Sequence, residues 1–224
     1  MNFTLNDYIY RTQKFLRDSL GTGYDVNFLT YCINQARCDA IYFSRCSRAL
    51  ALINLVPAQE LYPFSMVQAQ LVTQGTPALQ VLTVLNCTIE YSSTPLRIAL
   101  DYLPWSYFNA IYRSFPIQIY PTIWSQYDYQ SFYVAPIPSQ VYVLEVDCLF
   151  IPNDLVNLTD AETTIPQPWC DIVPVCACYW AKMFEQAKED VAYFEELAMK
   201  RFNVRLGATP PWRMPSQYGS AYTN

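Results

Sequence analysis

A central segment rich in prolines and aromatics, residues 115–154, constrains the fold more than any other part of the chain. It contains three strand-like runs, FPIQIYPTIW, SFYVAPIP and VYVLEVDCLFIPND. In the last run, apolar side chains alternate with Glu145 and Asp147, so one face of this strand should be buried and the other solvated. Prolines are confined to the edges and starts of strands, and Pro136 and Pro138 therefore indicate a small antiparallel sheet with blunted edges.

Helical patterns flank this segment on both sides. The first predicted helix covers residues 4–20 and opens with a capping box formed by Thr4 and Asp7. A second helix is expected over residues 25–47, because its apolar residues recur every three or four positions. The same spacing predicts one long helix over residues 169–202.

Three arginines, a turn signal and a proline give local expectations. Arg37, Arg45 and Arg48 lie off or beside the apolar face of the second helix, so a solvated face is expected for them. Two runs of β-forming residues on either side of Asn86 predict a hairpin. A short helix is expected from Pro104 onward, since proline suits the first turn of a helix.

These patterns predict an α+β fold. Residues 1–48 and 169–206 should form an antiparallel bundle of the N-terminal helices and the long C-terminal helix. Residues 49–168 are expected to form an inserted β-rich lobe that contains the short helix. Residues 207–224 remain as an extended C-terminal tail, because Pro210, Pro211 and Pro215 forbid a helix there.

Composition indicates a protein that binds other proteins. Charged residues make up 15% of the chain, below the roughly 25% of ordinary globular chains, and the chain contains 19 tyrosines. Tyrosine provides amphipathic contact area, so we favour interfaces over the rim of a sandwich for these side chains. The net charge of −5 and the lack of a basic run argue against binding nucleic acid by counterion release.

The residues that most enzymes need are missing. The chain has no histidine, which a Cys or Ser nucleophile would normally use as its base. Zinc is the sharpest alternative use of its eight cysteines, but Cys176 and Cys178 would point to opposite sides of a helix. We therefore predict no catalytic, cofactor-binding or metal-binding residues. Neither a signal peptide nor a membrane span is expected, because no apolar stretch is long enough.

The order of these parts resembles the head-to-tail connector adaptor proteins of tailed bacteriophages, especially the short-tailed ones. The resemblance covers roughly residues 1–206. It is carried by FLTYCINQAR, by YPTIWSQYDYQSFYVAPIPSQVYVLEVDCLFIPNDL, by the proline-tryptophan step at residues 165–169 and by WAKMFEQAKEDVAYFEELAMKRF. The cysteine richness departs from the family pattern and leaves extra cross-linking open.

The resemblance implies a structural virion protein at the head–tail junction, made in the host cytoplasm. It would form a ring, usually dodecameric, beneath the portal protein and above tail nozzle or tail tube proteins. Genomic DNA would pass through this ring without sequence-specific binding. The alternatives are another tail component, such as a nozzle or stopper subunit, and a non-viral peptide-binding module.

Three sets of residues are predicted to make these contacts. The extended tail would bind the portal through Pro210, Pro211, Trp212, Arg213, Tyr218 and Tyr222. The central block would meet a neighbouring subunit or a tail protein through Tyr120, Trp124, Tyr127, Tyr129, Phe132 and Tyr133. The first helix would approach DNA phosphates through Arg11, Lys14 and Arg17.

Overall fold

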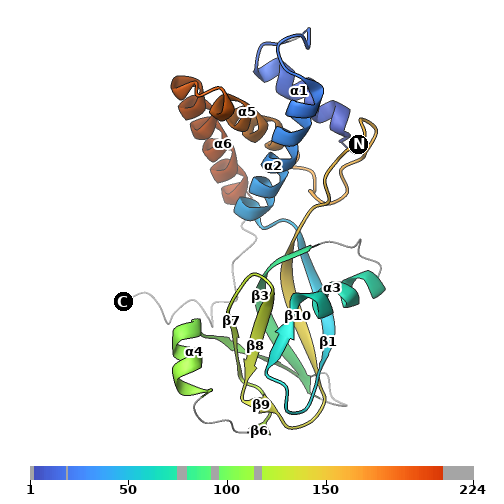
Figure 1. The fold of residues 1–224 in the computed structure, drawn as a ribbon, viewed down its shortest axis with the longest axis vertical. Helices are drawn as coiled ribbons and strands as arrows, with labels where there is room; N and C mark the ends of the chain where they lie inside the picture. The colour runs from blue at the N-terminus through green and yellow to red at the C-terminus, as the bar shows by residue number, and fades with distance from the viewer. Residues whose placement is uncertain (1–2, 19, 75–79, 92–95, 114–117, 209–224) are drawn as a thin grey trace. The chain divides into compact units, whose positions relative to one another are not determined.

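The chain forms two compact units that are each built from their own elements (Figure 1). The computed structural model describes residues 3–18, 20–74, 80–91, 96–113 and 118–208. The helical unit comprises Met1–Cys46 and Asp154–Asn224, and the β unit comprises Ser47–Asn153. The β unit is therefore an insertion, which the chain enters once and leaves once.

The described residues of the helical unit form four helices. They are α1 (Leu5–Phe15), α2 (Val26–Ser44), α5 (Val173–Phe184) and α6 (Lys188–Ala208). The Thr4–Asp7 capping box is confirmed at the start of α1, and Asp25 accepts hydrogen bonds from two backbone amides at the start of α2. Helix α5 packs against α1, α2 and α6, and its most extensive contact is with α2.

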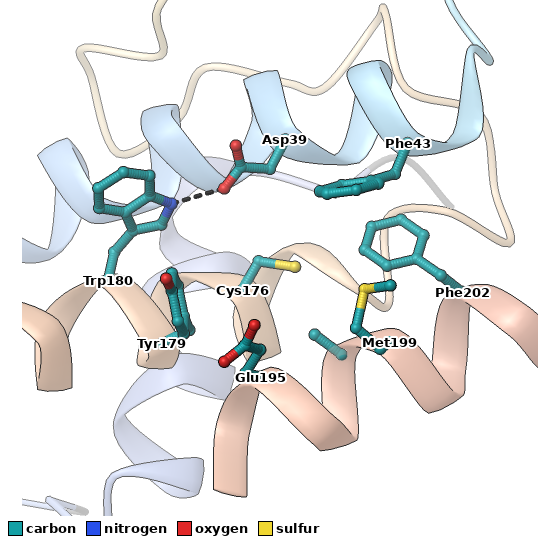
Figure 2. Close-up of a pocket in the computed structure, with 9 residues that line it drawn as sticks. Asp39, Phe43, Cys176, Tyr179, Trp180, Glu195, Met199 and Phe202 are labelled. Carbon is teal, nitrogen blue, oxygen red and sulfur yellow. Dashed lines mark hydrogen bonds between the residues drawn. The ribbon is translucent and has the colours of Figure 1, made fainter. Parts of the chain in front are cut away.

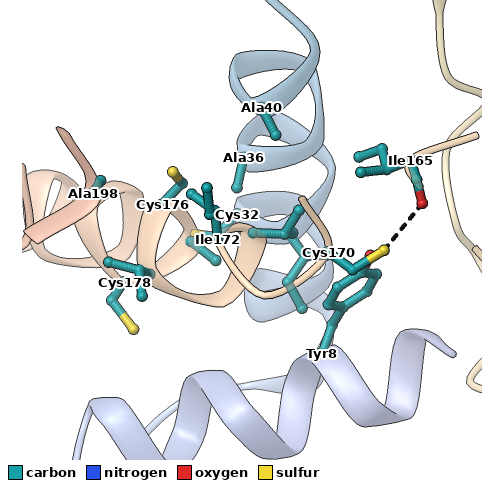
Figure 3. Close-up of a cluster of buried hydrophobic side chains, with 14 of the residues drawn as sticks. Tyr8, Cys32, Ala36, Ala40, Ile165, Cys170, Ile172, Cys176, Cys178 and Ala198 are labelled. Atoms are coloured by element: carbon teal, nitrogen blue, oxygen red, sulfur yellow. Dashed lines mark hydrogen bonds between the residues drawn. The ribbon is translucent and has the colours of Figure 1, made fainter. Parts of the chain in front are cut away.

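Small buried side chains allow α2 and α5 to pack closely. Cys32, Ala36 and Cys176 belong to the core of the helical unit (Figure 3). Cys176 and Cys178 point to different sides of α5: Cys176 lines a pocket with Asp39 of α2, whereas the Cys178 thiol donates to the Thr12 carbonyl of α1 at 3.6 Å. The spacing of these two cysteines is therefore explained by packing on both sides of one helix.

The expected long C-terminal helix is two helices. Helix α5 ends at Phe184 and α6 begins at Lys188, and Gln186 between them has a positive φ of 57°. No glycine or proline marks this break in the sequence. The first helix is also shorter than predicted, since it ends at Phe15.

Among its described residues, the β unit contains two four-stranded sheets and a short strand pair. The first sheet has the order β1 (Arg48–Leu55), β10 (Tyr142–Ile151), β3 (Gln80–Tyr91) and β4 (Leu96–Ala99), and all its pairs are antiparallel. The second has the order β2 (Leu61–Pro63), β8 (Ser131–Ala135), β7 (Ile123–Gln126) and β5 (Asp101–Tyr102). The pair consists of β6 (Gln118–Ile119) and β9 (Ile137–Pro138). Most strand pairs are antiparallel, as expected for this lobe, whereas β5–β7 and β6–β9 are parallel.

One apolar core joins the two larger sheets and a helix. It contains Ile53 and Leu144 from the first sheet, Phe132 from the second, and Val67 from α3 (Phe64–Thr73). A second helix, α4 (Trp105–Ile111), follows Pro104 as predicted. The apolar face of β10 is buried, as its alternation indicated.

Two local predictions in the β unit are wrong. The segment around Asn86 is not a hairpin, because β3 runs without interruption past it and pairs with β10, with register shifts along the way. Asp147 does not lie on a solvated face: its side chain is 11% exposed and forms an ion pair with Arg48. Pairing along a long central strand thus overrides the local turn signal.

A buried ion pair joins the segment that follows the β unit to helix α2. The Arg37 and Glu162 side chains are 2% and 0% exposed, and Nε and Nη2 of the arginine donate to the two carboxylate oxygens at 2.7 and 3.2 Å. Glu162 also accepts from the Tyr8 hydroxyl and from the backbone amides of Thr164 and Ile165. The expectation that Arg37 is solvated is therefore wrong.

The same network holds the chain where it leaves the β unit. Arg37 Nη1 donates to Asn34 Oδ1 at 3.1 Å. The Asn34 amide in turn donates to the carbonyl of Leu155 and accepts from its backbone amide, at 3.1 and 3.0 Å. Residues 154–168, assigned to the insertion from the sequence, therefore belong to the helical unit.

We predict that Glu162→Gln lowers the free energy of unfolding by about 3–5 kcal/mol, because it leaves the Arg37 charge buried without its partner. Urea unfolding followed by circular dichroism measures this. The double variant Arg37→Met/Glu162→Leu should regain much of the loss, since no buried charge remains. A loss below about 1 kcal/mol for Glu162→Gln would contradict the structural role of the pair.

We also predict a specific acid sensitivity. Burial alone would raise the pKa of Glu162, but hydrogen bonds and charge from Arg37, with the two backbone amides, hold this pKa below its ordinary value. The pKa of Glu162 is thus lower in the folded state than in the unfolded state. Glu162 therefore contributes fully to the free energy of unfolding above its unfolded pKa of about 4.3, and this contribution is lost as the pH falls through its folded pKa. Wild type should lose stability more steeply than Glu162→Gln from about pH 5 to about pH 3 in urea unfolding. Parallel pH profiles would contradict this assignment.

Candidate interaction surfaces

The β unit carries a group of aromatic rings in mutual contact, here called the aromatic cluster: Trp105, Tyr127 and Tyr133 with Arg113. Tyr127 is exposed, and Trp105 and Tyr133 are half-buried. The Trp105 ring centroid lies 4.6 Å from that of Tyr127 and 4.7 Å from that of Tyr133. The Arg113 guanidinium lies 5.7 and 5.4 Å from the Trp105 and Tyr133 centroids and pairs with Glu60 at 2.9 Å. Helix α4 and the β7–β8 hairpin thus position a surface of the residue types that dominate protein interfaces.

The six aromatics predicted for this surface divide into two groups. Tyr120, Tyr127 and Tyr129 are exposed, with 44%, 58% and 80% of their surface accessible, and Tyr133 is half-buried. Trp124 and Phe132 are buried at 2% and 0% and belong to the core of the β unit. The structure corrects the prediction for Trp124 and Phe132, because side chains alternate between the two faces of β7 and β8 and these two rings point into the core.

The sequence analysis does not predict two members of the aromatic cluster, Trp105 and Arg113. The partner of Arg113, Glu60, lies far away in the sequence, so only the fold brings these two side chains together.

A group of cations on the helical unit, here called the basic face, surrounds one carboxylate. It comprises Arg11 and Lys14 of α1 and Arg201 and Arg205 of α6, which line one depression with Asp171. Arg11 pairs with Asp171 at 2.7 Å and Arg205 does so at 3.5 Å. Arg201 donates to the Asp171 backbone carbonyl at 3.1 Å.

The three cations predicted to approach DNA are only partly brought together. Arg11 and Lys14 lie on the basic face, but Arg17 does not line it. Arg17 follows the end of α1 and has a positive φ of 60°. The two arginines of α6 were missed, because they are separated from α1 by most of the chain.

A pocket opens on another seam of the helical unit, between α2, α5 and α6 (Figure 2). Its volume is about 230 Å³. Aromatic rings and two carboxylates line it: Phe43, Tyr179, Trp180, Phe202, Asp39 and Glu195. Trp180 Nε1 donates to Asp39 Oδ2 at 2.6 Å.

The thiols are not set up for nucleophilic chemistry. All eight cysteines are free, and most are buried. Burial raises the pKa of Cys32 and of Cys46 to about 11, and that of Cys148 and of Cys176 to about 12. These thiols are protonated at neutral pH, whereas nucleophiles and metal ligands are thiolates. Across the described ranges, no group of three or more Cys, Asp or Glu side chains is arranged to hold a metal ion.

The predicted portal-binding residues lie outside the described residues. They are Pro210, Pro211, Trp212, Arg213, Tyr218 and Tyr222. Within the part of the chain that is described, no helix combines the length and apolar character needed to cross a bilayer.

Comparison with known proteins identifies the family. A search among curated proteins finds no match. The family model of the SU10 adaptor protein matches residues 3–215, which include both units and every surface described above. The chain therefore belongs to the SU10 adaptor protein family, a family of bacteriophage structural proteins.

Proposed function

We propose that this chain is a subunit of a closed ring, usually dodecameric in such adaptors, that lies beneath the portal and joins the capsid to the tail. The observation that carries this proposal is the family match over residues 3–215, which spans both units. The ring would surround the DNA exit channel at the head–tail junction of the virion. Its subunits would be made in the host cytoplasm.

The surfaces of the molecule support a binding role. The aromatic cluster offers the exposed ring of Tyr127, two half-buried rings and a guanidinium, and such residues supply much of the binding energy at interfaces. We assign this cluster, together with exposed Tyr120 and Tyr129, to contact with a tail protein or a lateral neighbour. No catalytic step is needed for this role.

The charge distribution fits a channel that DNA passes without being held. The chain carries a net charge of −5, which gives no general affinity for a polyanion. Proximity of Arg11, Lys14 and Arg17 to DNA stays a prediction. Arg11 is already engaged by Asp171, which reduces what it can offer a phosphate.

The portal contact is assigned to residues 209–224. This segment combines three prolines with Trp212, Tyr218 and Tyr222, a composition suited to an extended strap that orders on a partner. Ordering would cost part of the interface free energy. Anchoring to the portal and contact with the tail would then use different parts of one chain.

A nozzle or stopper subunit, the nearest alternative, would use similar surfaces but dock elsewhere in the tail. A non-viral peptide-binding module would not bind a portal at all. Mixing with purified portal rings separates these roles, because only the adaptor is expected to bind them directly.

We predict that the full chain co-sediments with purified portal rings and that a chain ending at residue 208 does not. The shortened chain keeps α6 whole, so its circular dichroism and thermal midpoint should match those of the full chain. Trp212→Ala/Tyr218→Ala/Tyr222→Ala should weaken binding about tenfold or more, since buried aromatic anchors dominate interfaces. The matched control is Tyr107→Ala, which removes a ring that is 64% exposed on the β unit. Unchanged co-sedimentation of the shortened chain would refute the assignment.

A further inference from the structure

We propose that the pocket between α2, α5 and α6 receives the basic face of a second copy of this chain, and that this contact repeats around the ring. The inference rests on the proposed ring and names the two surfaces that would join its subunits. Both surfaces lie on the helical unit. Each subunit would therefore use its pocket to bind one neighbour and its basic face to bind the other.

The pocket has the chemistry of a site for a basic side chain. The rings of Phe43, Trp180 and Phe202 line it, and the carboxylates of Asp39 and Glu195 reach it from different helices (Figure 2). Aromatic faces attract guanidinium and ammonium groups, more strongly when water is displaced. Carboxylates beside such faces add direct charge pairing.

The two carboxylates have no cation of their own among the residues that the structure describes. Asp39 is half-buried, and the polar contact found for its carboxylate is the hydrogen bond from Trp180. Burial raises the pKa of Asp39, and this hydrogen bond offsets the rise only in part. A half-buried carboxylate without a counter-charge costs stability in the isolated subunit. A cation from another molecule would remove that cost.

The basic face carries the opposite charge. Arg11, Lys14, Arg201 and Arg205 line one depression together with the carboxylate of Asp171. Phe15 lies in the same depression and is 37% exposed, so the face offers an apolar contact as well as charge. Acidic and aromatic groups are what such a face would bind.

A second copy fits this pair of surfaces better than DNA does. The pocket is lined by carboxylates and the basic face by cations, so one chain supplies two surfaces of complementary charge on separate seams. A contact between unlike surfaces of identical subunits repeats head to tail and closes into a ring. Exposed apolar side chains beside the pocket extend the contact, with Tyr42 at 66%, Phe43 at 46% and Met199 at 42%. The net charge of −5 does not favour association, so local complementarity must do so.

The test uses two variants that each reverse one surface. Glu195→Lys reverses the rim of the pocket, and Lys14→Glu/Arg205→Glu reverses the basic face. Each variant alone should assemble about tenfold or more weakly than wild type, because like charges meet at every contact. An equimolar mixture should assemble as well as wild type. In an alternating ring the two reversed surfaces meet each other, and so do the two unchanged ones.

Assembly is measured with the full chain by sedimentation velocity and native mass spectrometry, alone and with portal rings. Glu196→Lys and Lys200→Glu are the matched controls, since both reverse exposed charges on α6 outside the two surfaces. They should leave assembly unchanged. Asp39→Asn removes the negative charge, so it should weaken assembly. Because the new side chain can still accept the Trp180 hydrogen bond, the isolated subunit should be at least as stable as wild type.

The pairing is overturned if the mixture assembles no better than either variant, or if Glu196→Lys acts as strongly as Glu195→Lys. It is also overturned if the wild-type chain associates neither alone nor on the portal. If Lys14→Glu/Arg205→Glu assembles normally but the particles lose their DNA, the basic face serves DNA and the proposal is wrong. Self-association without any portal binding would instead refute the proposed function and leave the pairing supported.

Discussion

The helical unit depends on the buried pair of Arg37 and Glu162. Both charges are removed from water, and each is stabilised by the other and by neighbouring hydrogen bonds. Removal of one partner would leave an uncompensated charge in the core, which is among the costliest changes a fold can suffer. The pair therefore fixes where the chain must run after it leaves the β unit.

That constraint explains how an insertion of this size is accommodated. The strands next to its two ends, β1 and β10, pair antiparallel from Arg48 opposite Leu149. The outgoing and returning chain are thus held together at the base of the β unit. Beyond it, Asn34 binds Leu155 and Arg37 binds Glu162, so the return segment docks on α2 within a few residues.

Local signals predicted a good part of the fold. The capping box of Thr4 and Asp7, the cap at Asp25, the short helix after Pro104 and the buried face of β10 each follow from spacing within a few residues.

What the sequence did not predict depends on partners distant along the chain. Arg37 looks like a surface residue until Glu162, 125 positions away, is placed beside it. The turn signal at Asn86 fails because β3 pairs with β10 on both sides of this residue. The break at Gln186 carries no glycine or proline, and Trp124 and Phe132 are indistinguishable from surface aromatics until the first sheet packs against their own sheet. The basic face needs α1 and α6 together, which no local pattern reveals.

Electron cryo-microscopy of the head–tail junction of the assembled particle would show whether this chain forms the proposed ring. We expect density for this chain in a closed ring in contact with the portal, with α1 and α6 of one subunit facing α2, α5 and α6 of the next. Density for the chain elsewhere in the tail, or in copies that do not touch one another, would contradict it.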